Sequence, residues 1–322
     1  MSSEKAVAAR RGRGISFENL GLLVILVLLL GALWIAYPPI LARVNLINIL
    51  LTVSVIGIIA VPWSMLCLSG GLDISVGSMM GFIAILVSML YVNGMNLFLS
   101  ILVGCVVSGL LGLVNGVLIE KARINSIITT LGTYSILRGA AYALTGGQGI
   151  VLSSGSLKFL GLGRIWIFPF PVVLLLAFFV IGWLVLRYTQ LGRNIYVVGG
   201  NEKAARVVGI NATRLRIGLY VVTAIFAGFG GLIIAAQLSN ALPKIGTGYE
   251  FAVITAVVLG GVSLSGGKGR LLGVLIGMLI IGVLRYGLEI TGVHSFYQTI
   301  AEGAILLIAV ALDQLKLRRS GR

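Results

Sequence analysis

The chain has 322 residues, of which 58% are apolar and only 10% carry a formal charge, and its mean hydropathy is +1.10. Soluble domains carry about 25% charged residues, so this composition excludes an ordinary water-soluble protein. The net charge of +15 could indicate nucleic-acid binding, which needs Lys and Arg gathered on one folded surface. The basic residues instead lie between apolar runs. This excludes nucleic acid as a partner and indicates a lipid bilayer.

Apolar stretches recur from Leu20 almost to the C-terminus. About 20 apolar residues of helix cross the roughly 30 Å of hydrocarbon in a bilayer. We therefore predict an all-α integral membrane protein of about ten transmembrane or re-entrant helices. The expected spans cover residues 20–37, 46–68, 74–92, 96–119, 126–145, 170–187, 215–238, 250–265, 271–290 and 297–313.

The distribution of Lys and Arg predicts the orientation. With the N-terminus placed in the cytoplasm, the outer segments hold only Arg43, Lys158, Arg164 and Lys244 of the 24 basic residues. Cytoplasmic segments carry an excess of Lys and Arg, so we expect an even number of crossings and both termini in the cytoplasm. The expected organisation is a basic segment over 1–19, one transmembrane domain over 20–313 with an inner loop at 188–214, and a basic tail over 314–322.

Glycine provides 45 residues and is concentrated in two segments, Ser69–Gly77 and Gly260–Gly269. Close helix packing explains much of this glycine, but both segments hold more than packing needs. They predict broken or turning backbone, which is tolerated at membrane depth only where protein buries it or it lines a wet cavity. Such breaks are typical of a transport path. A simple turn between two helices is the alternative.

Charged residues inside predicted spans are costly, so each is a functional candidate. These residues are Arg138, Arg285, Glu289 and Glu302. Reflecting the last two helices about the turn near Val293 places Arg285 level with Glu302, and we expect an ion pair there rather than a solute contact. Arg138 shares a span with Thr133 and either lines a path or binds backbone carbonyls of a neighbouring segment.

Two polar features lie at expected helix starts. Asp73 precedes the apolar run from Ile74, where a carboxylate can cap free N–H groups; it could also order a gate. In the inner loop, Asn201 to Val208 predicts a short helix that Asn201 caps and Gly209 ends. An exposed inner helix suits a docking partner, and an ordinary solvated linker helix is the alternative.

We expect no catalytic, cofactor or metal site. Leu264–Lys268 imitates a nucleotide-contacting signature, but a phosphate loop needs a strand before it and a glycine where Val262 stands. His294 is the only histidine, so neither a histidine-based metal site nor a Ser-His-Asp triad can form. Cys67 and Cys105 lie in predicted spans without metal or redox spacing, so a disulfide is not expected.

Four segments in order resemble the permease subunits of bacterial ABC importers for ribose, xylose, arabinose, galactose and related solutes. They are Asn45–Leu50, Gly70–Ser78, Gly192–Ile210 and Gly246–Gly269, and the resemblance covers nearly the whole chain. It implies a multi-pass subunit of the bacterial inner membrane that pairs with a second permease. It also implies a cytoplasmic ABC ATPase, which binds ATP and Mg, and a periplasmic binding protein that delivers the solute.

The resemblance also implies roles for particular residues. Residues 199–210 are similar to the family's coupling helix, which would insert into the ATPase and drive alternating access. The candidate coupling residues are Gly199, Gly200, Asn201, Glu202, Ala204, Ala205, Arg206 and Gly209. The candidates for a translocation path or gate are Ser64, Gly70, Gly71, Asp73, Ser75, Thr133, Arg138, Gln237, Asn240, Tyr249, Glu250 and Thr255.

The chain departs from the ribose-type pattern after Glu250. Where such permeases often continue Leu-Asp-Ala-Ile-Ala-Ala, residues 251–256 read Phe-Ala-Val-Ile-Thr-Ala, so an acidic residue is replaced and the solute is not identified. An ion-coupled secondary transporter is the alternative function; it needs intramembrane carboxylates, which are few here and lie near helix ends. A membrane enzyme comes third, because no carboxylate pair stands in an obvious register for acid–base chemistry.

Overall fold

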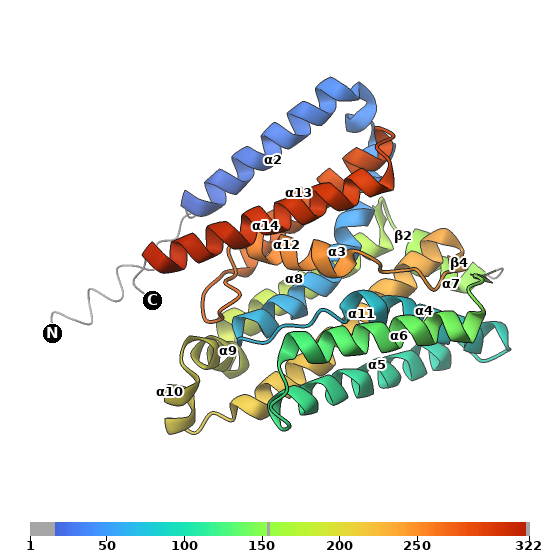
Figure 1. Cartoon of the computed structure of the whole chain (residues 1–322). Coiled ribbons are helices and arrows are strands. Elements are labelled where there is room, and N and C mark those ends of the chain that lie inside the picture. The colour runs from blue at the N-terminus through green and yellow to red at the C-terminus, as the bar shows by residue number, and fades with distance from the viewer. Residues whose placement is uncertain (1–16, 153–154, 320–322) are drawn as a thin grey trace.

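The computed structural model describes residues 17–152 and 155–319, which form a bundle of helices lying side by side (Figure 1). The helices are α2 (Phe17–Ala36), α3 (Arg43–Leu68), α4 (Val76–Val92), α5 (Leu97–Glu120), α6 (Ser126–Thr145), α7 (Gly155–Leu162), α8 (Phe170–Tyr188), α9 (Gln190–Gly200), α10 (Glu202–Val207), α11 (Ala212–Leu238), α12 (Tyr249–Leu259), α13 (Leu271–Ile290) and α14 (Ser295–Arg319), with a short 3₁₀ turn η1 (Pro38–Leu41). Strand β1 (Ile150–Val151) pairs antiparallel with β4 (Asn240–Ala241), and β2 (Arg164–Ile165) with β3 (Phe168–Pro169).

Every predicted span overlaps a helix, which confirms an all-α membrane protein. Among the described residues, six helices are long and apolar enough to cross a bilayer: α3, α5, α8, α11, α13 and Phe296–Leu315 of α14. The apolar parts of α2, α4 and α12 are shorter, and α6 is not among these apolar helices. The number of crossings and the side on which each terminus lies therefore stay predictions.

The two ends of the bundle differ. Figure 1 shows α9, α10, the start of α2 and the end of α14 at one end, and the short strands with α7 at the other. We call the first the basic end, because α9, α10 and the start of α11 carry Arg193, Lys203, Arg206, Arg214 and Arg216 there. It is the end that the distribution of charge places in the cytoplasm.

Small residues let α5 and α11 approach closely. The buried face of α5 repeats a small residue every fourth position, at Ser100, Gly104, Ser108, Gly112 and Gly116. A Cβ on Gly112 would lie 2.6 Å from the carbonyl oxygen of Tyr220 and 2.7 Å from the Cβ of Ala224. Backbone-to-backbone contact of this kind drives helix association in lipid, where burial of apolar surface gains little.

The helices are interrupted where glycine predicts it, with one correction. Residues 69–75 between α3 and α4 are not helical, as expected. The span predicted over 250–265 is too long, because α12 ends at Leu259 and a turn follows in which Gly261, Gly266 and Gly267 take left-handed φ values of +84°, +81° and +72°. Other residues rarely adopt these angles. The inner loop is also more ordered than expected, since α9 occupies most of its first half.

We expect Gly112→Leu to lower the thermal stability of the detergent-solubilised protein. A leucine side chain would push α5 away from α11, and overpacking of this kind typically costs about 1–3 kcal/mol. Gly218→Leu on α11 is the matched control, since nothing lies within 4 Å of a Cβ built there. Equal melting temperatures for the two variants in a fluorescence-detected unfolding assay would show that the α5–α11 contact is not tight.

Candidate functional site

Three segments meet in backbone contact at the basic end. The amide of Gly267 donates to the carbonyl of Leu68 over 2.8 Å. A Cβ on Gly266 would lie 3.0 Å from the amide nitrogen of Gly70 and 3.1 Å from the carbonyl oxygen of Gly199. We call this contact between residues 68–71, 199–200 and 266–267 the glycine junction. It joins the end of α9 directly to the breaks that follow α3 and α12.

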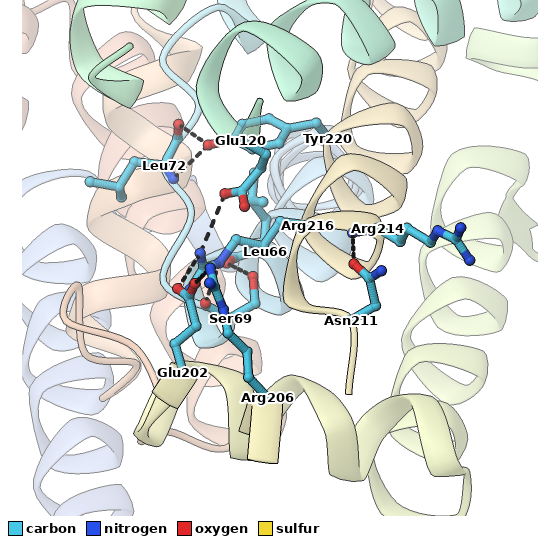
Figure 2. A network of polar contacts seen from close by, with 10 residues as sticks. All are labelled: Leu66, Ser69, Leu72, Glu120, Glu202, Arg206, Asn211, Arg214, Arg216 and Tyr220. Atoms are coloured by element: carbon cyan, nitrogen blue, oxygen red, sulfur yellow. Dashed lines mark hydrogen bonds and ion pairs between the residues drawn. The ribbon is translucent and has the colours of Figure 1, made fainter. Parts of the chain in front are cut away.

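Helix α11 holds the break after α3 through two side chains one turn apart. Arg216 Nε donates to the carbonyl of Ser69 over 2.9 Å. The hydroxyl of Tyr220 donates to the carbonyl of Leu72 over 3.1 Å and accepts from its amide over 3.3 Å. Figure 2 shows both side chains converging on this break. Their role was not predicted, because the partners lie far away in sequence and no local pattern reveals them.

Arg216 also forms ion pairs with two carboxylates. Its Nη1 lies 2.7 Å from Glu202 Oε2 on α10 and 3.4 Å from Glu120 Oε1 at the end of α5. Glu202 pairs in addition with Arg206, 2.5 Å away and one turn along α10. A cavity of about 170 Å³ borders this network, lined by Ile119, Glu120, Arg123, Glu202, Arg206 and Arg216.

The helix predicted from Asn201 to Val208 is confirmed as α10. The side chain of Asn201 accepts from the amide of Ala204 over 3.0 Å, and Gly209 has a φ of +80°. Ala205 is fully buried. Val207 and Val208 are instead 88% and 70% exposed. Sequence analysis did not single out these valines as contact residues.

Asp73 does not cap α4 as expected, because Ser75 is the N-cap residue and no side-chain hydrogen bond caps this helix start. The Oδ1 of Asp73 accepts from the amide of Ser75 over 2.8 Å and from the hydroxyl of Ser75 over 2.6 Å. Asn115 on α5 donates to that hydroxyl over 3.1 Å and accepts from Thr133 on α6 over 2.6 Å. A hydrogen-bonded chain therefore connects the break to α5 and α6. Asn115 was missed because nothing in its apolar span marks it.

Arg138 binds backbone carbonyls, one of the two roles left open above. Its Nη1 donates to Pro243 over 2.6 Å and to Ile245 over 2.9 Å, and its Nη2 donates to Gly77 over 3.1 Å. Glu250 also lies against Gly77, because a Cβ on that glycine would overlap its carboxylate. Arg138 therefore ties the turn before α12 to the start of α4.

The ion pair predicted across the last two helices is confirmed, since Arg285 Nε lies 2.8 Å from Glu302 Oε1. The same guanidinium lies over the ring of Tyr249, 4.2 Å from its centre. This arrangement fixes α12 against α13 and α14.

Of the other path candidates, Ser64 and Thr255 are buried and Gln237 and Asn240 are half-buried. The hydroxyls of Ser64 and Thr255 donate to carbonyls of their own helices. Gln237 Nε2 and Asn240 Oδ1 are buried without a hydrogen-bond partner in the described part of the chain. A cavity of about 210 Å³ near the strands contains none of the candidates among its lining residues, which are Met89, Val92, Asn93, Leu144, Thr145, Gln148, Gly149 and Ile150. The path itself therefore stays a prediction.

The pKa of Glu202 predicts how the network responds to acid. Burial raises this pKa, but the hydrogen bonds and charges of Arg216 and Arg206 outweigh burial and leave it below the ordinary value of 4.5. A lowered folded-state pKa means that the ion pairs persist above that value and are lost as the pH falls through the folded pKa.

We therefore expect a nitroxide label at position 203 to stay immobile from about pH 7 down to below about pH 4.5 and then to gain mobility. Electron paramagnetic resonance spectra recorded across an acid titration measure this. Glu202→Gln should remove the acid step. A gain of label mobility above pH 4.5, or one that persists in Glu202→Gln, would contradict the role given to Glu202.

Comparison with known proteins identifies the family. A family model described as "Branched-chain amino acid transport system / permease component" matches residues 45–310. The ribose import permease protein of Bacillus subtilis (strain 168) is 40% identical over 302 residues, 93% of this chain and 92% of the relative. The L-arabinose ABC transporter permease protein of Azospirillum brasilense is 36% identical over 318 residues, 98% of this chain and 94% of the relative.

The ribose import permease protein of Escherichia coli (strain K12) is 39% identical over 276 residues, 84% of this chain and 86% of the relative. No solved structure matches the chain. The similarity runs through both breaks and the α9–α10 segment, which lie within the matched residues. The chain is a multi-pass membrane protein of this permease family and belongs among the permeases of monosaccharide ABC importers.

Proposed function

We propose that the chain is the translocation subunit of an ATP-driven importer for a monosaccharide or a sugar-like small polar solute in the bacterial inner membrane. The glycine junction carries this proposal, because it connects the exposed helices α9 and α10 to both backbone breaks. A partner that moves these helices would move the breaks. The names of the relatives, which specify ribose and L-arabinose, support a sugar as solute.

Helix α10 is the proposed contact with a cytoplasmic ABC ATPase, which would bind ATP and Mg. Its exposed tip is apolar at Val207 and Val208, and the cations Lys203 and Arg206 flank it. Exposed apolar residues rimmed by charge are typical of protein contacts. The chain itself contributes no nucleotide site to this proposal.

Alternating access would proceed from the basic end. Closure of the ATPase would displace α10 and α9, and the glycine junction would pass that displacement to α3 and to the turn after α12. Arg138 ties the turn before α12 to the start of α4, directly after the break that follows α3. Two packed arrangements of such rigid elements provide the inward- and outward-facing states. A periplasmic binding protein would deliver the solute at the opposite end and set much of the selectivity.

A second permease is proposed to cover α6. This helix is not among the apolar helices able to cross a bilayer, yet Ser135, Gly132 and Gly139 on it are exposed. Nothing lies within 4 Å of a Cβ built on either glycine. Small residues on an exposed face let another membrane helix pack closely. The partner is a second copy of this chain or a related permease.

A secondary transporter is the alternative function. One observation favours it: Asp73 Oδ2 and Glu250 Oε2 are buried without a hydrogen-bond partner in the described residues, and ion coupling uses buried carboxylates. Asp73 lies in the break after α3 and Glu250 at the start of α12, and both positions suit the binding of a cation or proton.

Reconstitution distinguishes the two functions. We expect proteoliposomes that contain this permease, its ATPase and its binding protein to accumulate a monosaccharide from a panel that includes D-ribose and L-arabinose, only when ATP is present. Native mass spectrometry of the assembly should show two permease chains for each complex. Accumulation driven by a sodium or proton gradient, with permease alone, would contradict the proposal and support the secondary transporter.

Substitution at the tip of α10 tests the docking surface. We expect Val207→Asp to weaken ATPase binding about tenfold or more, about 1.4 kcal/mol, because it places a charge in a dry contact. Val151→Asp is the control, since Val151 is 68% exposed at the opposite end. Surface plasmon resonance with permease in nanodiscs measures both. Equal affinities would place the ATPase elsewhere.

A further inference from the structure

We propose that Arg216 is the positioning residue through which α10 controls the break after α3, and that Glu120 and Glu202 alternate as its principal partner. This inference rests on the proposed function and assigns a residue of its coupling step. Figure 2 shows the arrangement: the guanidinium of Arg216 lies between Glu202, Glu120 and the carbonyl of Ser69.

The three contacts use different parts of the guanidinium. Nε is engaged by the carbonyl of Ser69, while Nη1 is shared between the two carboxylates. Planar, delocalised arginine can serve several acceptors at once, which the compact ammonium of lysine cannot do in the same geometry. Arg216 therefore connects α10, α5 and the break through one rigid group.

The two carboxylates lie at unequal distances from Nη1 of Arg216. Glu202 Oε2 is the nearer acceptor at 2.7 Å, and Glu120 Oε1 is at 3.4 Å. The side chains of Arg216 and Glu120 are only 14% and 10% exposed, whereas that of Glu202 is 32% exposed. The pair with Glu120 is thus the better shielded from water, and the pair with Glu202 is the one that a docking partner can reach.

Two carboxylates allow α10 to move without leaving a buried cation unpaired. An isolated charge in a shielded position is costly, and removing one partner of a buried pair is strongly destabilising. If α10 is displaced, Glu202 leaves and Glu120 retains the guanidinium. The hydrogen bond from Arg216 to the carbonyl of Ser69 then changes with the orientation of the guanidinium. We infer that displacement of α10 reaches the break as a change in this hydrogen bond.

Tyr220 gives the movement a direction. Tyr220 lies one turn further along α11 than Arg216. Its hydroxyl hydrogen-bonds both the carbonyl and the amide of Leu72. The middle of the break is therefore fixed to α11 by a neutral residue, and its first residue, Ser69, is held by the charge network that α10 can alter. A change at Arg216 would rotate the break about Leu72.

The test uses permease, ATPase and binding protein in proteoliposomes, with D-ribose and L-arabinose as solutes. We expect Arg216→Gln to retain ATP hydrolysis but to lower the solute accumulated per ATP hydrolysed by about 5-fold or more, the lower range for coupling between two sites. Glu202→Gln should show the same loss. Arg216→Lys should restore part of the ratio, because it keeps the charge without the fork.

Arg214→Gln is the matched control, because Arg214 is exposed on the same helix and its side chain forms none of the ion pairs found in the described residues. A ratio for Arg216→Gln equal to that of this control would overturn the inference. Glu202 lies on a short surface helix, so Glu202→Gln keeps the bundle intact if Arg216→Gln does not fold. A wild-type ratio in that variant would equally overturn it.

A second measurement does not depend on the solute. Cys67 is fully buried beside the break, with its Sγ 3.5 Å from the carbonyl of Ser263. In a Cys105→Ser background, ATP and the ATPase should change the rate at which a small thiol reagent labels Cys67 in the wild type but not in Arg216→Gln. Equal responses would overturn the inference alone, whereas failure of ATP-driven accumulation in the wild type would overturn the proposed function.

Discussion

Peptide groups that no water can reach need partners inside the protein, and this constraint organises the structure. An unsatisfied N–H or C=O in hydrocarbon costs several kcal/mol, so the non-helical residues 69–75 exist only because other helices satisfy them. Arg216 binds the carbonyl of Ser69, Tyr220 binds both groups of Leu72, and Trp63 Nε1 donates to the carbonyl of Asp73 over 2.8 Å. Side chains from α3 and α11 therefore satisfy several peptide groups of the break.

Because other elements supply these hydrogen bonds, the break responds to movements of those elements. In a helix the hydrogen bonds are local and move with the segment. Here they come from α3 and α11, and through Arg216 they extend to α10 and α5, so a shift of any of these elements alters the break. The glycine junction adds a second, stiffer connection, because backbones in contact cannot slide past one another without separating. Exposed α10 is thus linked to the bundle by a charge network and by packing.

The turn before α12 repeats the principle with different residues. Arg138 on α6 binds carbonyls of that turn and of the start of α4, and its guanidinium lies 5.5 Å from the ring centre of Tyr134 one turn away. In both places an arginine and a tyrosine one turn apart on a helix lie at irregular backbone. Charged residues in this bundle act mainly through backbone carbonyls and ion pairs, which limits how many are free to meet solute.

The sequence by itself determined the features that depend on local chemistry. Apolar runs predicted the helices, glycine predicted both breaks, Asn201 and Gly209 delimited α10, and the reflection about Val293 placed Arg285 opposite Glu302. Only the tertiary structure decided which carbonyls Arg138 and Arg216 bind, that Ala205 faces inward, and that Asn115 connects α5 to the break. These contacts join residues far apart along the chain. They depend on how glycine and serine faces allow whole helices to approach, and no local pattern encodes that approach.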